Sequence, residues 1–365
     1  MPMKIKWVRG NERISFNRPN IWFCLGVKGS GKSSFLETLG EYHLDMNHVV
    51  LDLFGSADGE GLAWLRSPYA ENKRILLLHG ENVDVDCSFD VKTASKLTLK
   101  DFDQYDLIIN ARPLYSNADD EFMNAAQIMD KIYKRISWKR LLYCVVREAA
   151  NLFYSRLKIS ENQVMAKSQM IYMIREARHV GMSMGLDSLR YYAIDIDIRN
   201  ITDYLILKSQ GLLGLSKDLK WLYSIFQPLS IRNLPPDRFI ILTRKGCIGM
   251  GRFTEVTWHK QEKENILRAV GIHVEPAAEP PKQAEYRGTF KTVSDKEHAE
   301  IIRLYIEEKM AMHVIAKQIG RSNRTVYEHI QKHNESIIRS AFCPICRRVK
   351  SSLEKEMAKR NKKVD

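Results

Sequence analysis

Residues 21–40, IWFCLGVKGSGKSSFLETLG, decide the fold of this chain. The run begins with five apolar residues typical of a buried strand, passes through a glycine-rich turn, and continues from about residue 32 to 43 with apolar residues at helical spacing. Within it, GVKGSGKS (26–33) matches G-x-x-x-x-G-K-S/T at every fixed position. In this pattern the backbone N–H groups point at phosphate oxygens, and the helix that follows places its positive end beneath them. The stretch therefore predicts a strand, a phosphate-binding loop and a helix.

The side chains of this loop predict that the chain binds a nucleoside triphosphate with Mg²⁺; the loop does not distinguish ATP, the expected nucleotide, from GTP. Lys32 is expected to reach the β- and γ-phosphates, which also makes it a predicted catalytic residue, and the Ser33 hydroxyl is expected to ligate Mg²⁺. A chance glycine-rich turn is the alternative, but both flanks are those that the motif requires. The residues predicted to contact the nucleotide are Gly26, Lys28, Gly29, Ser30, Gly31, Lys32, Ser33 and Ser34.

The composition indicates a sizeable core and a polyanionic partner. Of the 365 residues 44% are hydrophobic, and the formal net charge is +13. Such a basic balance favours nucleic acid first and a membrane surface second. No apolar run approaches the length of a membrane span, and the first residues lack an apolar signal core. Most cysteines are isolated in the sequence, which is typical of a reducing compartment, so a cytoplasmic protein is expected.

Further apolar runs predict an α/β fold, a parallel sheet flanked by helices. Helical periodicity follows in two longer segments, 117–137 and 161–180. A small hairpin is expected between residues 80 and 100, a strand over 238–247, and a second short strand or an extended lid over 249–258. An acidic, glycine-rich loop with Asp58 and Glu60 follows the first of the expected strands, which are 48–54 (HVVLDLF), 74–79 (RILLLH), 105–110 (YDLIIN) and 141–146 (LLYCVV).

A P-loop hydrolase also needs an acidic group on a strand neighbouring the loop strand, where it orients Mg²⁺ and activates water. The strand 141–146 is followed by Arg147 and Glu148, so Glu148 is the predicted catalytic acid, while an arginine stands where an aspartate is usual. The alternative for Glu148 is a solvated residue at the start of a helix. With arginine at 147, we expect Asp52 to share Mg²⁺ with Ser33. Slow hydrolysis, or binding without hydrolysis, stays open.

The order of these elements resembles the HerA/FtsK class of P-loop ATPases, which includes conjugation and viral DNA-packaging motors. The resemblance spans roughly residues 20–260 and depends on three runs, GVKGSGKSS, a strand followed by REAANLF, and IREARHVGMSMGLDSLR with IDIDIR. It implies a RecA/FtsK-like parallel sheet, double-stranded DNA as partner and a homo-oligomer, hexameric in that class. Arg147 departs from the class pattern, as do Asp187 and Ser188, where the class has a Thr-Gln sensor.

The same resemblance implies that an arginine of a neighbouring subunit reaches the nucleotide, because such a residue stabilises charge on the transferred phosphoryl group. Arg175 and Arg178 in the run REAR are the candidates, and Arg178 is the predicted catalytic one. Alternatively, both are exposed helix residues that pair with Glu176 and its neighbours.

A composition break divides the chain. We expect a P-loop ATPase domain over 1–274, a proline-rich linker over 275–290, a helix-turn-helix domain over 291–340, and a cysteine knuckle with a basic tail over 341–365. Ser294 and Glu297 have the spacing of a capping box at the start of an amphipathic helix.

Residues 313–333, HVIAKQIGRSNRTVYEHIQKH, are similar to a helix-turn-helix of the resolvase or response-regulator type. Gly320 is expected to provide the left-handed turn between the two helices. The second helix of such a unit enters the major groove. A three-helix protein-interaction module is the alternative. The residues predicted to contact DNA are Arg321, Asn323, Arg324, Thr325 and Tyr327.

A zinc site is a further hypothesis. Cys343 and Cys346 form a C-P-x-C pattern, and His329 and His333 lie one helical turn apart just before it. These four side chains are of the types that bind Zn²⁺. A metal shared between subunits and a redox-sensitive cysteine pair are the alternatives.

Together the motifs favour a DNA-translocating or DNA-packaging motor that hydrolyses ATP and holds DNA through the helix-turn-helix. The alternative is an ATP-switched DNA-binding regulator with little or no hydrolysis, which Arg147 favours. A small-molecule or nucleoside kinase is a weaker interpretation, since a kinase has no need of a helix-turn-helix on a tether.

Overall fold

A computed structural model of the chain describes residues 3–55, 59–133, 140–155, 161–175, 180–212, 214–259, 265–277, 293–340 and 345. It consists of two compact units, Met1–Glu279 and Pro280–Asp365. Across the described ranges, no helix combines the length and the apolar character needed to cross a membrane.

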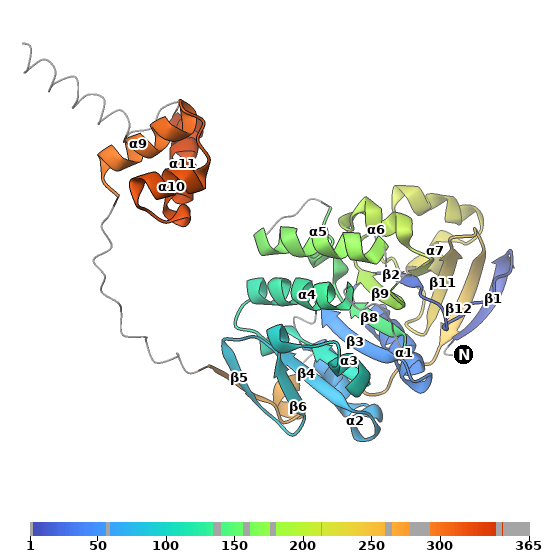
Figure 1. The fold of residues 1–365 in the computed structure, drawn as a ribbon. Coiled ribbons are helices and arrows are strands. Elements are labelled where there is room, and N and C mark those ends of the chain that lie inside the picture. The colour runs from blue at the N-terminus through green and yellow to red at the C-terminus, as the bar shows by residue number, and fades with distance from the viewer. Residues whose placement is uncertain are drawn as a thin grey trace, which may run out of the picture. The chain divides into compact units, whose positions relative to one another are not determined.

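The first unit is built on one large, mostly parallel sheet (Figure 1). The order of its strands is β1-β12-β11-β10-β2-β9-β8-β3-β7-β4-β6. From β10 to β6 each strand runs parallel to its neighbours, whereas β11, β12 and β1 continue the sheet as antiparallel strands at one edge. The bounds are β1 (Met3–Arg9), β2 (Ile21–Leu25), β3 (Val49–Phe54), β4 (Ile75–His79), β6 (Asp90–Thr93), β7 (Leu107–Asn110), β8 (Leu142–Val146), β9 (Met182–Ser188), β10 (Tyr204–Leu207), β11 (Arg238–Thr243) and β12 (Ile248–Phe253).

Helices cover both faces of this sheet. Helix α1 (Lys32–Asp45) follows β2 and leads to β3, whereas α4 (Ala118–Tyr133) and α5 (Glu161–Arg175) lead back from β7 to β8 and from β8 to β9. Because parallel crossovers are right-handed, α4 and α5 lie on the face opposite α1. Figure 1 shows α4 and α5 side by side. The shorter helices are α2 (Tyr69–Asn72), α3 (Asp101–Gln104), α6 (Ile196–Ile201), α7 (Pro228–Arg232) and α8 (Ile266–Ala269).

Burial on both faces explains why the central strands are almost entirely apolar. Every residue of β2, β3, β7 and β8 is buried. A parallel sheet covered by helices on both faces leaves no solvent-facing side for alternate residues. The predicted strands and the predicted helix after the phosphate loop are therefore confirmed, α1 extending to Asp45.

The expected hairpin between residues 80 and 100 is wrong. The segment does contain two short strands, β5 (Val83–Asp86) and β6, but they do not pair with each other. Strand β6 joins the large sheet beside β4, and β5 pairs with β13 (His273–Pro276) in a separate two-stranded sheet. Strand β13 thus extends into the stretch expected as linker, and residues 278–292 lie outside the described ranges.

The lateral position of β8 also differs from expectation. The strand that carries Arg147 and Glu148 was expected to neighbour the loop strand, but β9 lies between β2 and β8. The reason is the crossover through α5, which returns the chain and inserts β9 into that gap.

In the described part of the second unit, residues 293–340, α9 (Asp295–Ile306), α10 (Met312–Ile319) and α11 (Asn323–Ser340) surround a small apolar core. The predicted capping box is confirmed, since Ser294 and Glu297 exchange both hydrogen bonds at the start of α9. Gly320 has a φ of 73° and ends α10, as expected. Helix α11 extends beyond the run 313–333, to Ser340. The core residues are Ile301, Ile302, Leu304, Ile315, Ala316, Val326 and Ile330.

Candidate functional site

The phosphate-binding loop lies between the end of β2 and the start of α1, at the edge of the sheet where the parallel strands end. Gly29 and Gly31 have φ angles of 73° and 81°, which residues with a side chain rarely adopt. A Cβ on Gly31 would lie 2.7 Å from the Pro236 carbonyl oxygen, and one on Gly26 would lie 2.6 Å from Ser30 Oγ. The close approach of these backbones therefore requires the glycines of the motif.

The side chains of the loop suit a phosphate group. Lys32 is buried and its Nζ donates to the Val27 carbonyl oxygen at 3.2 Å, so the ammonium lies over the loop. Ser30 Oγ is buried and has no hydrogen-bond partner among the described residues. Lys28 is exposed at the rim, and Ser34 is buried at the start of α1. An orphaned hydroxyl, a buried ammonium and a helix N-terminus are the groups that an anion would satisfy.

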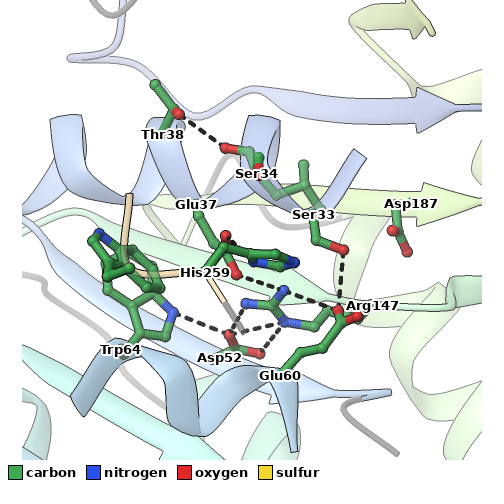
Figure 2. Close-up of polar contacts among 12 residues, drawn as sticks. Ser33, Ser34, Glu37, Thr38, Asp52, Glu60, Trp64, Arg147, Asp187 and His259 are labelled. Carbon is green, nitrogen blue, oxygen red and sulfur yellow. Dashed lines mark hydrogen bonds and ion pairs between the residues drawn. The ribbon is translucent and has the colours of Figure 1, made fainter. Parts of the chain in front are cut away.

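Arg147, at the position where an acid is usual, is the centre of a buried ionic cluster (Figure 2). Its Nε and Nη2 donate to the carboxylate of Asp52, with Nη2 at 2.6 Å from Oδ2, and its Nη1 donates to Glu37 Oε1 at 2.9 Å. Glu60 Oε2 lies 3.5 Å from the same Nη1. The planar guanidinium can serve several carboxylates at once because it carries five donors. The charge of Arg147 is therefore fully compensated inside the protein.

Burial and the charge of Arg147 act in opposite directions on the pKa values of the two buried carboxylates. Burial raises the pKa of Asp52, against the opposing effect of Arg147 and of the hydrogen bond from Trp64. Burial would also raise the pKa of Glu37, but Arg147 and His259 lower it further than burial raises it. The Glu37 carboxylate in turn raises the pKa of His259 above its ordinary value despite burial, with His259 Nδ1 at 2.8 Å from Glu37 Oε2.

Asp52 and Ser33, the two expected Mg²⁺ ligands, have different hydrogen-bond partners in the structure. Asp52 lies within β3 with an exposure of 0%, and its oxygens accept hydrogen bonds from Arg147 and Trp64. The Ser33 hydroxyl instead donates to Glu60 Oε2 at 3.0 Å (Figure 2). The physical reason is the guanidinium of Arg147, which takes up the carboxylate of Asp52 and separates it from the loop.

Glu148 lies at the same edge of the sheet but is held by another strand. Its φ of 45° is unusual for a residue with a side chain, and its N–H donates to Asp187 Oδ1 at the end of β9. Burial raises the pKa of Asp187 to about 6, and the charge of Lys32 acts in the opposite direction. Because β9 lies between β2 and β8, Asp187 is hydrogen-bonded to the backbone of Glu148 and is also influenced by the charge of Lys32. In the sequence, Asp187 was noted only because the resembling class has a Thr-Gln sensor at positions 187 and 188.

The arginines predicted to reach a neighbouring subunit's nucleotide are Arg175 and Arg178, and no contact among the described residues joins Arg175 to the phosphate-binding loop. Arg175 pairs with Asp197 at 2.8 Å, and both side chains are about half exposed. Arg178 and Glu176 lie outside the described residues, as does Asp58.

In the second unit, two of the predicted DNA-contacting residues pair with carboxylates of the unit itself. Arg321 donates to both oxygens of Glu297 at 2.9 and 3.0 Å, which ties the turn to the start of α9. The Arg324 side chain is 88% exposed and pairs with Glu328 one turn along α11. Asn323 and Tyr327 are exposed, and Thr325 is partly buried, its N–H donating to Ser322 Oγ.

The structure joins the predicted zinc histidines to a third histidine. His329 Nδ1 lies 3.0 Å from His298 Nδ1, and the rings of His298 and His333 are 5.9 Å apart. Cys343 and Cys346 lie outside the described residues. Within the described part of the chain, no group of three or more His, Cys, Asp or Glu residues could hold a metal ion.

No protein-family model matches the sequence, and no curated protein matches it. Solved structures that match this chain include the genome packaging NTPase B204 from Sulfolobus turreted icosahedral virus 2, with 15% identity, coverage of 67% of this chain and 100% of that chain, and a TM-score of 0.39. The pCW3 conjugation coupling protein TcpA has 16% identity, coverage of 73% and 70%, and a TM-score of 0.38. EccC of Thermomonospora curvata has 13% identity, coverage of 70% and 41%, and a TM-score of 0.38. Identities and TM-scores this low do not assign a function to this chain.

Proposed function

We propose that this chain is an ATP-hydrolysing motor that acts on double-stranded DNA. The observation that supports the proposal is the phosphate-binding loop at the carboxyl edge of the parallel sheet, with Lys32 and Ser33 at the start of α1 and Glu148 shortly after the end of β8. The loop N–H groups and Lys32 hold the β- and γ-phosphates, Ser33 is a ligand of Mg²⁺, and Glu148 orients the attacking water. Bound Mg²⁺ supplies positive charge to the phosphate oxygens.

The proposal assigns DNA binding to the second unit. Its α10, Gly320 and α11 have the order and the turn of a helix-turn-helix, and Arg324 and Tyr327 are exposed near the start of α11. An exposed guanidinium and a phenol can reach phosphates or base edges. The net charge of +13 favours a polyanion. A homo-oligomer, hexameric by resemblance, with Arg175 or Arg178 directed at a neighbour's nucleotide, belongs to the same proposal.

One observation favours a second candidate, an ATP-switched DNA-binding regulator with little hydrolysis. Arg147 occupies the position of the usual metal-orienting aspartate, and its buried ion pairs with Asp52 and Glu37 fix it there. A positive charge at this position does nothing to bind a cation. In the switch, ATP changes the affinity for DNA while turnover stays slow.

Steady-state ATP hydrolysis with and without double-stranded DNA separates the two candidates. We expect DNA to stimulate turnover by wild type, and Glu148→Gln to lose that turnover while still binding a fluorescent ATP analogue. If neither wild type nor Glu148→Gln hydrolyses ATP, and ATP changes the affinity for DNA, the regulator is the correct candidate and the motor is not. Lys32→Ala is the matched control for the loop, and analogue binding that is unaffected by it would contradict both candidates.

A further inference from the structure

The hydrogen bond between Ser33 and Glu60 connects the loop helix to a segment that the motif does not include. Ser33 is the second residue of α1, and its hydroxyl donates to Glu60 Oε2 at 3.0 Å. Glu60 is the first residue of a 3₁₀-helix, Glu60–Arg66, that follows β3. The carboxyl ends of β2 and β3 lie at the same edge of the sheet, which brings the two residues together although 27 positions separate them.

The segment that carries Glu60 is held firmly. Gly59, just before it, has a φ of 78°, and a Cβ there would lie 2.5 Å from Ile266 Cγ2. Within the 3₁₀-helix, Trp64 is fully buried with its ring 4.5 Å from that of Trp258. A carboxylate on such a support is presented to Ser33 in a defined position rather than by a mobile loop.

Among the carboxylates around Arg147, Glu60 differs in its access to solvent. The side chains of Asp52 and Glu37 are 1% and 0% exposed, whereas that of Glu60 is 34% exposed. Asp52 and Glu37 also receive the shorter contacts from the guanidinium, at 2.6 and 2.9 Å against 3.5 Å for Glu60. Glu60 is therefore the member of the cluster whose oxygens face both the Ser33 hydroxyl and water (Figure 2).

We propose that Glu60 is the carboxylate that orients Mg²⁺ at Ser33, in place of the aspartate that Arg147 replaces. This inference depends on the nucleotide binding proposed above. Hard divalent cations prefer oxygen ligands, and Mg²⁺ keeps several waters and uses one or two carboxylates beside the phosphates. Arg147 is a positioning residue in this scheme, because it occupies Asp52 and Glu37 and draws the Glu60 carboxylate toward the loop. Glu148 keeps its proposed role in orienting the attacking water, and its N–H donates to Asp187.

The test measures how strongly Mg²⁺ tightens the binding of a fluorescent, non-hydrolysable ATP analogue to the full chain. We titrate wild type, Glu60→Gln and Glu71→Gln in EDTA and at increasing Mg²⁺. Glu71 is an exposed acid on α2 and serves as the matched control. For Glu60→Gln we expect analogue affinity in EDTA within about twofold of wild type, and a Mg²⁺ concentration for half-maximal enhancement at least tenfold higher, as the loss of one good ligand implies. Glu71→Gln should follow wild type.

Each outcome decides a different point. If Glu60→Gln keeps the wild-type Mg²⁺ dependence, the assignment of Glu60 is wrong, while the proposed nucleotide binding stands. If wild type does not bind the analogue, the proposed function itself fails. Glu60→Asp, which keeps the charge on a shorter side chain, should recover part of the Mg²⁺ response, and a response no better than that of Glu60→Gln would also overturn the assignment. A second readout independent of turnover is the binding of Mn²⁺ in the presence of the analogue, which is measured as the decrease of the EPR signal of free Mn²⁺.

Discussion

Arg147→Met tests whether the buried cluster stabilises the first unit. The substitution keeps an unbranched side chain but removes the charge that serves Asp52 and Glu37, both with an exposure of 0%. Each carboxylate keeps one hydrogen-bond partner, the neutral indole of Trp64 for Asp52 and the imidazole of His259, at 2.8 Å, for Glu37. Breaking a buried ion pair by removing one partner costs about 3–5 kcal/mol, because the remaining charge is left without compensation. We expect the free energy of unfolding to fall by that amount.

The measurement is urea unfolding followed by tryptophan fluorescence. All six tryptophans of the chain precede residue 259, so the signal reports on the first unit alone. Arg252→Met is the matched control: the Arg252 side chain is 73% exposed and pairs with Asp237, and exposed pairs contribute at most about 1 kcal/mol. An Arg147→Met variant that unfolds within about 1 kcal/mol of wild type, as the control does, would refute the reasoning.

The pH dependence of the same variant gives an independent check. Burial already raises the pKa of Asp52, and loss of Arg147 removes the group that lowers it. A carboxyl whose folded-state pKa is raised binds protons in the native state before the unfolded state does, so native stability increases as the pH falls toward the ordinary pKa. We therefore expect the deficit of Arg147→Met to shrink between pH 7 and about pH 5. A deficit that is constant over this range would mean that the lost stability comes from packing and not from charge.

Two further predictions concern the loop and the second unit. Gly31→Ala should weaken analogue binding at least tenfold, because the new Cβ would lie 2.7 Å from the Pro236 carbonyl oxygen. Gly29→Ala is the control and should lose less affinity, because its Cβ meets no atom within 4 Å and only the φ of 73° opposes the substitution. Equal losses of affinity in both variants would contradict this prediction. Burial lowers the pKa of His298 to about 4, and the charge of His329 adds to the effect. The unfolded state therefore takes up the proton first, and the second unit loses stability as the pH falls from about 6.5 toward 4. Hydrogen exchange of α9, corrected for the intrinsic effect of pH, should accelerate over this range in wild type and less in His298→Gln.

The sequence predicted the loop and its strands because the causes are local. Glycines with positive φ, the lysine and serine that open α1, and the apolar residues of β2 all lie within residues 21–40, and each acts through its own backbone or its nearest neighbours. The same holds for the capping box of α9, whose two members are three residues apart. Such features need no knowledge of the rest of the chain.

The partners in the candidate site could not be predicted in this way. Arg147 meets Asp52 across 95 positions and Glu37 across 110, and these contacts depend on which strands are neighbours. Apolar runs give strands but not their lateral order, since every buried strand of a parallel sheet has the same pattern. The insertion of β9 between β2 and β8 was missed for that reason.

What the sequence alone determined is therefore a strand, a phosphate loop and a helix, followed by further strands and a separate helical segment. Only the tertiary structure decided which carboxylate faces Ser33. Sequence spacing favoured Asp52 because it lies in the strand that follows α1, and Glu60 stood out only as an acid in a glycine-rich loop. In the folded chain a buried guanidinium must be neutralised by the nearest buried carboxylates, so Arg147 takes Asp52 and Glu37, and the partly exposed Glu60 is left beside the hydroxyl.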